Sequence, residues 1–312
     1  MDISVSVFLS VYNHKKYIVQ CIESILSQKT NFNYEIVIHD DASTDGTTDI
    51  LLSYKEKYKE KINLIVQNEN QYHIGVNNLI YRYVIPHIKG KYLAYIDGDD
   101  YWCDDNKLQK QFDYMEAHPN CSLCVHNVYC VDDANNVLHD AFPTSYGRVK
   151  KSTVIDYRRG IFIATSSLFY RFSSFKKFPD WRLNFPVNDM PAFIQASYDG
   201  YTYKLKDRMS AYRRFSETSW SKKMLDNSKR IESNNQIIRA LKMIDLDNNP
   251  YKKLIIRKIN RFYFSNALLS KDFKTIFSSK NRYFFHRLRF KEQVLLILEY
   301  RFNWLYRKRF KQ

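Results

Sequence analysis

Residues 92–102 read Tyr-Leu-Ala-Tyr-Ile-Asp-Gly-Asp-Asp-Tyr-Trp, an apolar run that ends in three carboxylates within four positions. The apolar part is typical of a strand buried in a parallel sheet. Like charges so close together repel, so their clustering indicates a bound cation. Hard oxygen ligands suit Mg²⁺ or Mn²⁺ held jointly with substrate phosphates. The alternative is a solvated acidic turn, with Asp104 or Asp105 capping the next helix.

The same pattern occurs earlier in the chain. Residues 35–41 form a second apolar run, which ends in Asp40 and Asp41 and continues into a stretch of Ser, Thr, Asp and Gly. These residue types favour tight turns, and Ser43 or Thr44 could cap the following helix. A carboxylate after a strand of an α/β sheet can also accept hydrogen bonds from a nucleotide base or ribose. The residues alone leave a turn and a ligand site equally open.

Around these two runs, short apolar stretches alternate with amphipathic ones. In the first 130 residues the pattern predicts strands at 5–9, 35–39, 62–66 and 92–96, and helices at 18–26, 47–58, 75–87 and 107–118. Such alternation predicts an open α/β sheet with mainly parallel strands, whose ligands bind outside the carboxyl ends of the strands. Further on, strands are predicted within 121–131, 161–170 and 203–205, and a helix at 189–198.

Residues 222–312 differ from the rest in charge. Residues 1–221 hold 26 Lys and Arg and 26 Asp and Glu, so the chain's net charge of +16 arises entirely from the last 91 residues. This region is helical in pattern and rich in aromatic residues. Basic helices of this kind can lie in the interface of an anionic membrane, and packing on the first domain is the alternative. No motif for nucleic acid accompanies the charge, so nucleic acid is not an expected partner.

The location of the protein follows from two negative observations. The sequence lacks a signal-peptide pattern after Met1 and any run of about 18 apolar residues, the length that a membrane span needs. Its five cysteines are odd in number and have no framework spacing, and Cys121 and Cys124 alternate with apolar neighbours as in a strand. We therefore expect a cytoplasmic protein, with the basic tail allowing a peripheral position on the inner face of the cell membrane.

Taken in order, these segments resemble the family 2 glycosyltransferases, which have a GT-A fold. Val5 to Asn13 is similar to the opening strand of the family and its Val-Tyr-Asn ending, and Val37 to Thr47 is similar to its Val-Asp-Asp-x-Ser-x-Asp-Gly-Thr motif. Asn70 to Asn78 resembles the third element, and Lys89 to Trp102 resembles the strand with its D-x-D segment. The match covers most of residues 4–221.

The resemblance implies a domain organisation and a set of donor contacts. Residues 1–221 would form the GT-A domain, with a nucleotide-sugar-binding half at 1–130 and an acceptor-binding half at 131–221, and residues 222–312 would form a helical extension. Asp99 would hold the Mn²⁺ or Mg²⁺ ion, which neutralises charge developing on the departing diphosphate. The nucleotide-sugar would be bound by Tyr12, Asn13, Asp41, Asn78, Asp97 and Gly98.

Two further positions follow from the resemblance. Asp189 stands where the family has a catalytic Asp at the start of a helix, and it would take the proton from the acceptor hydroxyl in an inverting attack. A carboxylate at a helix N-terminus fits this position without catalysis as well. Residues 212–221 resemble the closing loop of the family, in which Arg213 or Arg214 could clamp the diphosphate. Phe215 stands where many members have a His.

The resemblance thus implies an inverting glycosyltransferase, with a UDP-sugar as the favoured donor and a glycan or lipid-linked molecule as acceptor, in bacterial surface polysaccharide synthesis. A non-catalytic sugar-nucleotide or glycan binding protein with a degenerate site is the alternative, and Phe215 is its main support. A nucleotidyltransferase would need a Gly-rich triphosphate loop near the N-terminus, whereas residues 10–14 contain no Gly.

Overall fold

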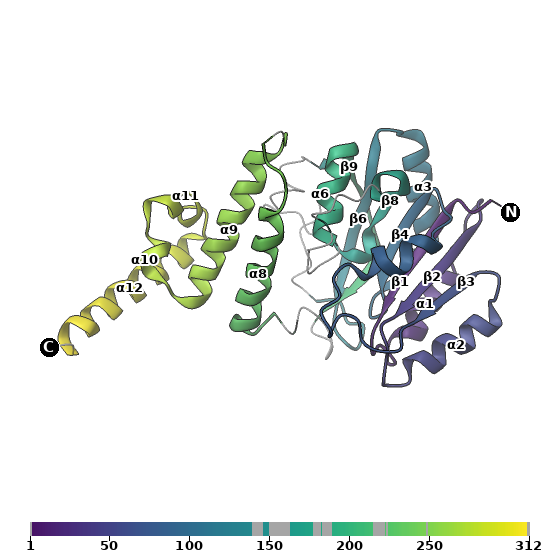
Figure 1. Ribbon diagram of the computed structural model, residues 1–312, viewed down its shortest axis with the longest axis horizontal. Helices are drawn as coiled ribbons and strands as arrows, with labels where there is room; N and C mark the ends of the chain where they lie inside the picture. Colours follow the sequence, from purple (N-terminus) through teal and green to yellow (C-terminus); the bar gives the residue numbers. More distant parts are fainter. Residues whose placement is uncertain are drawn as a thin grey trace. The chain divides into compact units, whose positions relative to one another are not determined.

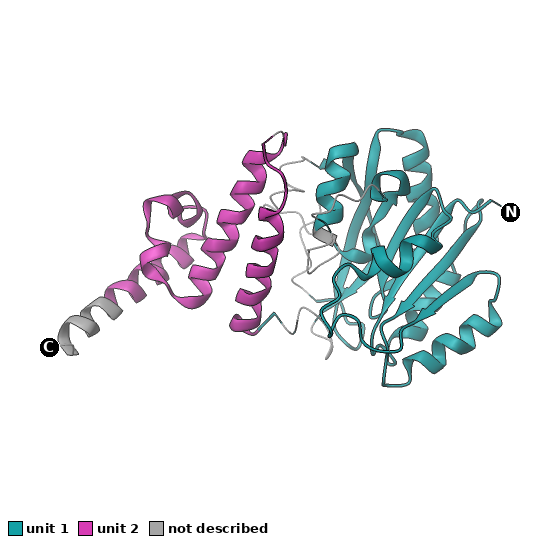
Figure 2. Ribbon diagram, in the orientation of Figure 1, with its two compact units in different colours: residues 1–225 teal, residues 226–312 magenta. Residues whose placement is uncertain are grey.

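The structure is a computed structural model, and it describes residues 2–138, 146–149, 163–176, 182, 189–214, 222, 224–247 and 249–310. The chain divides into two compact units, residues 1–225 and residues 226–312 (Figure 2). Unit 1 is an α/β domain built on one mixed sheet, and the described part of unit 2 is helical (Figure 1). The two units are treated separately below.

The sheet of unit 1 has the order β3-β2-β1-β4-β8-β6-β9-β5 in the described residues, and β7 pairs with β9. The four strands β3, β2, β1 and β4 are mutually parallel, which confirms the predicted α/β sheet. Strand β8 is antiparallel to both β4 and β6, and it joins the parallel half to the rest of the sheet. The strands are β1 Val5–Val11, β2 Tyr34–Asp40, β3 Ile62–Val66, β4 Tyr92–Asp97, β5 Tyr101–Trp102, β6 Cys121–Val131, β7 Gly147–Val149, β8 Phe169–Arg171 and β9 Tyr201–Arg213.

Helices cover both faces of this sheet. Strand β1 shows why: Val5, Val7 and Leu9 point into one apolar cluster and Phe8 into the other, so the strand is buried on both sides. Helices α1 Ile18–Leu26, α2 Thr47–Lys57 and α3 Lys107–Ala117 contribute to the first cluster. Helices α5 Phe172–Phe175 and α6 Asp189–Asp199 contribute to the second.

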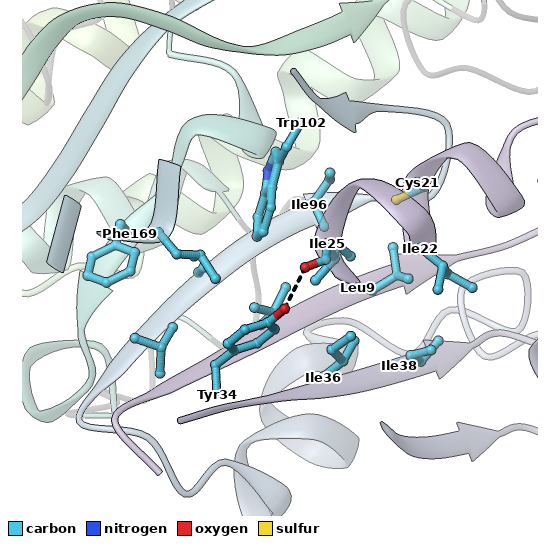
Figure 3. Packing of buried hydrophobic residues seen from close by; sticks show 14 of the residues in the cluster. Leu9, Cys21, Ile22, Ile25, Tyr34, Ile36, Ile38, Ile96, Trp102 and Phe169 are labelled. Atoms are coloured by element: carbon cyan, nitrogen blue, oxygen red, sulfur yellow. Dashed lines mark hydrogen bonds between the residues drawn. The ribbon is translucent and has the colours of Figure 1, made fainter. Parts of the chain in front are cut away.

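Figure 3 shows the first cluster, in which α1 lies over the parallel strands. The hydroxyl of Tyr34 donates a hydrogen bond to the carbonyl of Ile25 at 2.8 Å, so the polar end of a buried ring is satisfied within the core. Trp102 closes the cluster next to the acidic segment, and its indole N–H donates to the carbonyl of Ser166 at 3.1 Å. The packing therefore holds the segment after β4 from two sides.

Two predicted elements differ in the structure. The helix predicted at 75–87 is a short π-helical turn, Ile80–Val84, followed by a 3₁₀ turn, Ile85–His87. Asn78 has a left-handed backbone with φ 62°, and Pro86 has no N–H to give, so neither fits a regular helix there. In the second case, residues 161 and 162 of the strand predicted at 161–170 lie outside the described residues, and a 3₁₀ turn at Thr165–Ser167 precedes the strand Phe169–Arg171.

Unit 2 confirms the predicted helical extension. A core of Phe264, Ala267, Ile276 and Phe284 lies between its helices. Within the described residues, no helix of the chain is both long enough and apolar enough to cross a bilayer. The helices of this unit are α8 Asn227–Lys242, α9 Lys252–Ser270, α10 Phe273–Ile276, α11 Arg282–Phe285 and α12 Phe290–Phe310.

Candidate functional site

The candidate site lies at the carboxyl ends of three adjacent parallel strands. Strand β1 is in the middle, and the register pairs its Val11 with Asp40 of β2 and its Ser10 with Asp97 of β4. The pairing continues beyond the strands, because the N–H of Asp41 donates to the Val11 carbonyl at 3.0 Å and the N–H of Gly98 donates to the Ser10 carbonyl at 2.9 Å. Six of the predicted site residues thus meet at one edge of the sheet: Tyr12, Asn13, Asp41, Asp97, Gly98 and Asp99.

At the end of β2 the carboxylates are surrounded by hydrogen-bond donors. Asp40 is fully buried and accepts hydrogen bonds from the N–H and hydroxyl of Ser43 and from the hydroxyl of Thr48. Asp41 is 5% exposed, and its two oxygens accept the backbone N–H groups of Gln71 at 2.8 Å and Tyr72 at 3.1 Å. These contacts fix the loop after β3 against the end of β2.

Helix α2 begins differently from the prediction. Asp45 accepts the N–H of Thr47, the first helical residue, at 3.0 Å, whereas Ser43 and Thr44 make no such contact. Ser43 instead receives the N–H of Asn13 at 2.9 Å. Its side chain is therefore used to join the end of β1 to the end of β2.

Asn13 and Tyr12 lie where β1 ends. Asn13 has a left-handed backbone with φ 55°, and its side-chain oxygen accepts the N–H of Thr44 at 2.7 Å. The ring of Tyr12 meets the ring of His73 edge to face, with centroids 5.7 Å apart. Tyr12 therefore lies beside the same loop that Asp41 holds. The predicted nucleoside contacts Tyr12 and Asp41 share one neighbourhood.

At the end of β4 three carboxylates lie close enough for their charges to affect one another. A tight turn brings them together, since the N–H of Asp100 donates to the Asp97 carbonyl at 3.0 Å. Asp97 and Asp99 are half-buried, while Asp100 is 2% exposed. Burial, together with the charges of Asp99 and Asp97, raises the pKa of the Asp100 carboxyl well above its usual range. Gly98 is required at this turn, because a Cβ there would lie 2.6 Å from Nδ1 of His14.

A turn that brings three carboxylates together fits a divalent cation. Within the described residues, no three His, Cys, Asp or Glu side chains form a group that could hold a metal by itself. Mg²⁺ and Mn²⁺ sites of nucleotide enzymes commonly use one or two carboxylates and complete the coordination with water and substrate phosphates. The turn at 97–100 has the chemistry for a site of that kind.

Arg213, at the end of β9, binds this turn through both its side chain and its backbone. Its guanidinium donates from Nε to the Asp99 carbonyl at 2.9 Å and from Nη1 to the Asp132 carbonyl at 2.7 Å. Nη2 donates to Oε1 of Gln20 at 3.2 Å and to Oδ1 of Asn135 at 2.8 Å, and the backbone N–H donates to Oδ1 of Asp100 at 2.9 Å. The residue is 2% exposed. Its donors are therefore directed at the protein itself, whereas Arg214 next to it is half-buried.

With this geometry in view, comparison with known proteins decides the family. Residues 6–178, more than half of the chain, match the sequence pattern of Glycosyl transferase family 2. The chain belongs to glycosyltransferase family 2. Its solved neighbours include TarS of S. aureus in complex with UDP-GlcNAc, with a TM-score of 0.61 and 18% identity over 95% of this chain and 79% of that chain. A second is the mannosyltransferase PcManGT of Pyrobaculum calidifontis with GDP-Man and Mn²⁺, with a TM-score of 0.56 and 16% identity over 95% and 86%. The family 2 domain thus has the GT-A fold.

Several curated proteins are similar in sequence to this family 2 chain. An uncharacterized protein of Mycobacterium tuberculosis is 31% identical over 70% of this chain and 61% of its own length. The putative teichuronic acid biosynthesis glycosyltransferase TuaG of Bacillus subtilis is 39% identical over 48% and 58%. WfaP of Escherichia coli, named as a UDP-Glc:α-D-GlcNAc-diphosphoundecaprenol β-1,3-glucosyltransferase, is 34% identical over 50% and 62%. The chain spans about three fifths of the length of these relatives.

Three other residues that the sequence analysis singled out have different outcomes. Asn78 is 4% exposed, and its side-chain amide donates to the carbonyl of Arg182, so it ties two chain segments together. Asp189 is the first residue of α6, which confirms the predicted helix, and its side chain lies outside the described residues. Phe215 and the rest of the closing loop, 215–221, also lie outside them.

Proposed function

We propose that the protein is an inverting glycosyltransferase that transfers a sugar from a nucleoside diphosphate sugar to a hydroxyl of a glycan or lipid-linked acceptor. The observation that carries the proposal is the common edge of β2, β1 and β4, where Tyr12, Asp41 and the turn at 97–100 meet in a family 2 domain. Ligands of open α/β sheets bind at such an edge. A UDP-sugar is the favoured donor, and surface polysaccharide synthesis is the favoured setting, as the names of TuaG and WfaP suggest.

In this proposal the two acidic clusters have separate tasks. Tyr12, Asn13 and the loop held by Asp41 would bind the nucleoside, while Asp97 and Asp99 would face the diphosphate. Asp99, assisted by Asp97, would hold Mn²⁺ or Mg²⁺, which neutralises the charge that develops on the leaving diphosphate. Arg214 would bind the phosphate oxygens, because the donors of the Arg213 guanidinium are directed at the protein.

Asp189 would act as the general base. The oxygen of the acceptor hydroxyl forms the new bond to the anomeric carbon while the bond from that carbon to the diphosphate breaks on the opposite face. The hydroxyl proton passes to Asp189, and the nucleoside diphosphate leaves with the bonding electrons. Asp189 begins α6, and the N-terminus of a helix stabilises a carboxylate in its charged form, which a general base needs.

We further propose that the enzyme works at the inner face of the cell membrane, where a lipid-linked acceptor is embedded. The five cysteines support a reducing compartment, because none of them forms a disulfide in the structure and Cys103 is exposed. The favoured acceptor class comes from the name of WfaP, which includes a diphosphoundecaprenol sugar.

A screen of the purified chain against a panel of nucleotide sugars tests the proposal. Thermal unfolding and release of nucleoside diphosphate are measured with Mn²⁺ and with EDTA. We expect one donor to raise the melting temperature only with metal and to be slowly hydrolysed. Stabilisation by a donor that is never hydrolysed or transferred would instead favour a sugar-nucleotide binding protein with a degenerate site.

The variant Asp189→Asn tests the proposed base. We expect it to bind the donor as the wild type does and to lose transfer by about 10³-fold, within the range found for general bases. The matched control is Asp113→Asn, which alters an exposed carboxylate on α3. Full transfer activity in Asp189→Asn would show that another group accepts the proton.

A further inference from the structure

Helix α12 of unit 2 has two contrasting faces. One face packs on its own unit: Leu296 lies against the core of Phe264, Ala267, Ile276 and Phe284. Tyr300 contacts Phe273 and Phe277, with ring centroids 5.7 and 5.0 Å away, and Glu299 forms an ion pair with Lys271. These contacts fix the rotation of the helix about its axis. The side of α12 that faces away from the unit is therefore known.

The opposite face is exposed and holds several large apolar side chains together with two cations. Phe290 is 81% exposed, Leu298 59% and Phe302 75%, which are high values for large apolar side chains. At 3.6 residues per turn the exposed apolar residues other than Tyr300 fall on one side of the helix, because their spacings from the first are 4, 5, 7, 8 and 12 residues. We call this strip the outer α12 face; it consists of Phe290, Val294, Leu295, Ile297, Leu298 and Phe302.

Cations accompany the outer α12 face. Lys291 and Arg301 are exposed and fall within the strip by the same helical spacing, and Arg287 and Arg289 are exposed just before the helix. Residues 226–312 contain 21 Lys and Arg against 7 Asp and Glu, whereas residues 1–225 contain 28 against 26. Unit 2 therefore carries most of the net positive charge of the chain. Long basic side chains can extend from an apolar strip to contact headgroups.

We propose that the outer α12 face docks on an anionic lipid bilayer. Its large apolar side chains would enter the boundary between headgroups and acyl chains, while Lys291, Arg301 and the neighbouring cations would meet lipid phosphates. A second copy of the chain is a poorer occupant, because it would bring two strongly positive surfaces together. The inference adds a binding surface to the proposed function and does not depend on transfer activity.

Sedimentation of the full chain with lipid vesicles tests the proposal. One set of vesicles is phosphatidylcholine, and the other contains about one quarter phosphatidylglycerol. We expect at least about tenfold stronger binding to the anionic set, weakened when NaCl is raised to about 0.5 M, since salt screens exposed charges. No binding of the folded chain to anionic vesicles would overturn the proposal.

Variants assign the binding to the named face. Replacing Leu295, Leu298 and Phe302 together by Ser should lower binding to anionic vesicles at least about tenfold, because their apolar surface no longer enters the bilayer. The matched control is Leu52→Ser on α2, a leucine that is 51% exposed in unit 1, and it should bind as the wild type does. Binding of the triple variant at the wild-type level would overturn the assignment to this face.

Two further measurements separate the alternatives. The double variant Lys291→Glu with Arg301→Glu should reduce binding to anionic vesicles but not the weak binding to phosphatidylcholine. Metal-dependent donor binding, measured without vesicles, should be the same in all variants, so that a failure of the donor site is seen independently of a failure of docking. If light scattering finds a dimer of the wild type that the triple variant abolishes, the face serves self-association and the proposal is wrong.

Discussion

The carboxylates at the end of β2 and those at the end of β4 lie at the same edge of one sheet, yet their surroundings differ. Asp40 and Asp41 accept hydrogen bonds from backbone N–H groups and hydroxyls of three nearby segments. Burial, together with the charges of Asp99 and Asp97, raises the pKa of Asp100 at the end of β4, and Asp100 also accepts the backbone N–H of Arg213. The first cluster is held by hydrogen-bond donors of the protein, and the second combines burial with repulsion among its carboxylates.

The two clusters illustrate how an acidic cluster that holds the fold differs from one that suits a ligand. Both clusters follow a buried strand, so their position in the sequence does not separate them. Asp40 and Asp41 receive donors from neighbouring segments and hold those segments in place, whereas a cation would relieve the repulsion among Asp97, Asp99 and Asp100. Substitution of the carboxylates at the end of β2 should therefore lower the free energy of unfolding. Substitution of those at the end of β4 should lower the transfer activity.

The largest expected effect is at Asp99. We expect Asp99→Asn to lower the kcat for nucleoside diphosphate release by about 10³-fold, or about 4 kcal/mol, because the proposed metal would lose its main protein ligand. The melting temperature without metal should be unchanged or higher, since one of three repelling charges is removed. Mn²⁺ titration of activity and thermal unfolding measure the two effects. A loss of stability with activity retained would show that Asp99 supports the fold, as Asp40 and Asp41 do.

Arg213 gives the next largest effect, because it fixes the β4 turn through the Asp99 carbonyl. Arg213→Lys keeps the charge but not the planar set of donors, so we expect kcat to fall about 10²-fold, or about 3 kcal/mol, and the Mn²⁺ requirement to rise. The control is Arg148→Lys, an exposed arginine on β7. An unchanged Mn²⁺ requirement in Arg213→Lys would mean that the residue does not position the turn.

Asp41→Asn should affect stability more than catalysis. The amide keeps the shape of the carboxylate but turns an NH₂ group toward one of the two N–H donors, Gln71 or Tyr72. We expect a loss of about 2 kcal/mol in the free energy of unfolding, the cost of leaving a buried donor unpaired. Urea denaturation measures it, with the exposed Asp49→Asn as control. A large fall in kcat with unchanged stability would reverse the distinction between the clusters.

The arrangement of the parallel strands was predictable, because a strand buried on both faces has an apolar run that ends abruptly in polar residues. The meeting of the 35–41 and 92–102 segments at one edge followed from the same pattern and is confirmed by the strand register. The helix at 75–87 was predicted wrongly, because apolar spacing outweighed Asn78 and Pro86, whose backbone preferences interrupt it.

The position of Arg213 was beyond prediction from the sequence. Its partners Gln20, Asp99, Asp132 and Asn135 come from segments far apart in the chain, so no periodicity reveals them. An arginine next to a phosphate site is expected to bind phosphate, and only its burial shows that its donors serve the protein. The run of turn-forming residues around Asn135 was a weak sequence signal for a loop. In the structure Asn135 has a left-handed backbone with φ 67°, which fits such a turn.

Lys107 is a buried cationic group of the same domain, and its side chain has no polar partner within the described residues. Within the described residues its Nζ has no hydrogen-bonding partner and lies 4.0 Å from the centre of the Trp102 ring, and burial lowers the pKa of Lys107 to about 7. Between pH 7 and the ordinary lysine pKa of 10.5, the unfolded chain binds a proton that the folded chain lacks, so stability rises with pH.

We expect the unfolding free energy of the wild type to gain about 1 kcal/mol per pH unit from pH 7 to 9 relative to Lys107→Met. Urea denaturation at three pH values measures this slope, and Lys110→Met, in which an exposed lysine paired with Asp104 is lost, should follow the wild type. Parallel curves for wild type and Lys107→Met would mean that Lys107 keeps its proton when folded, and burial alone would then be a poor guide to which charges in this domain are uncompensated.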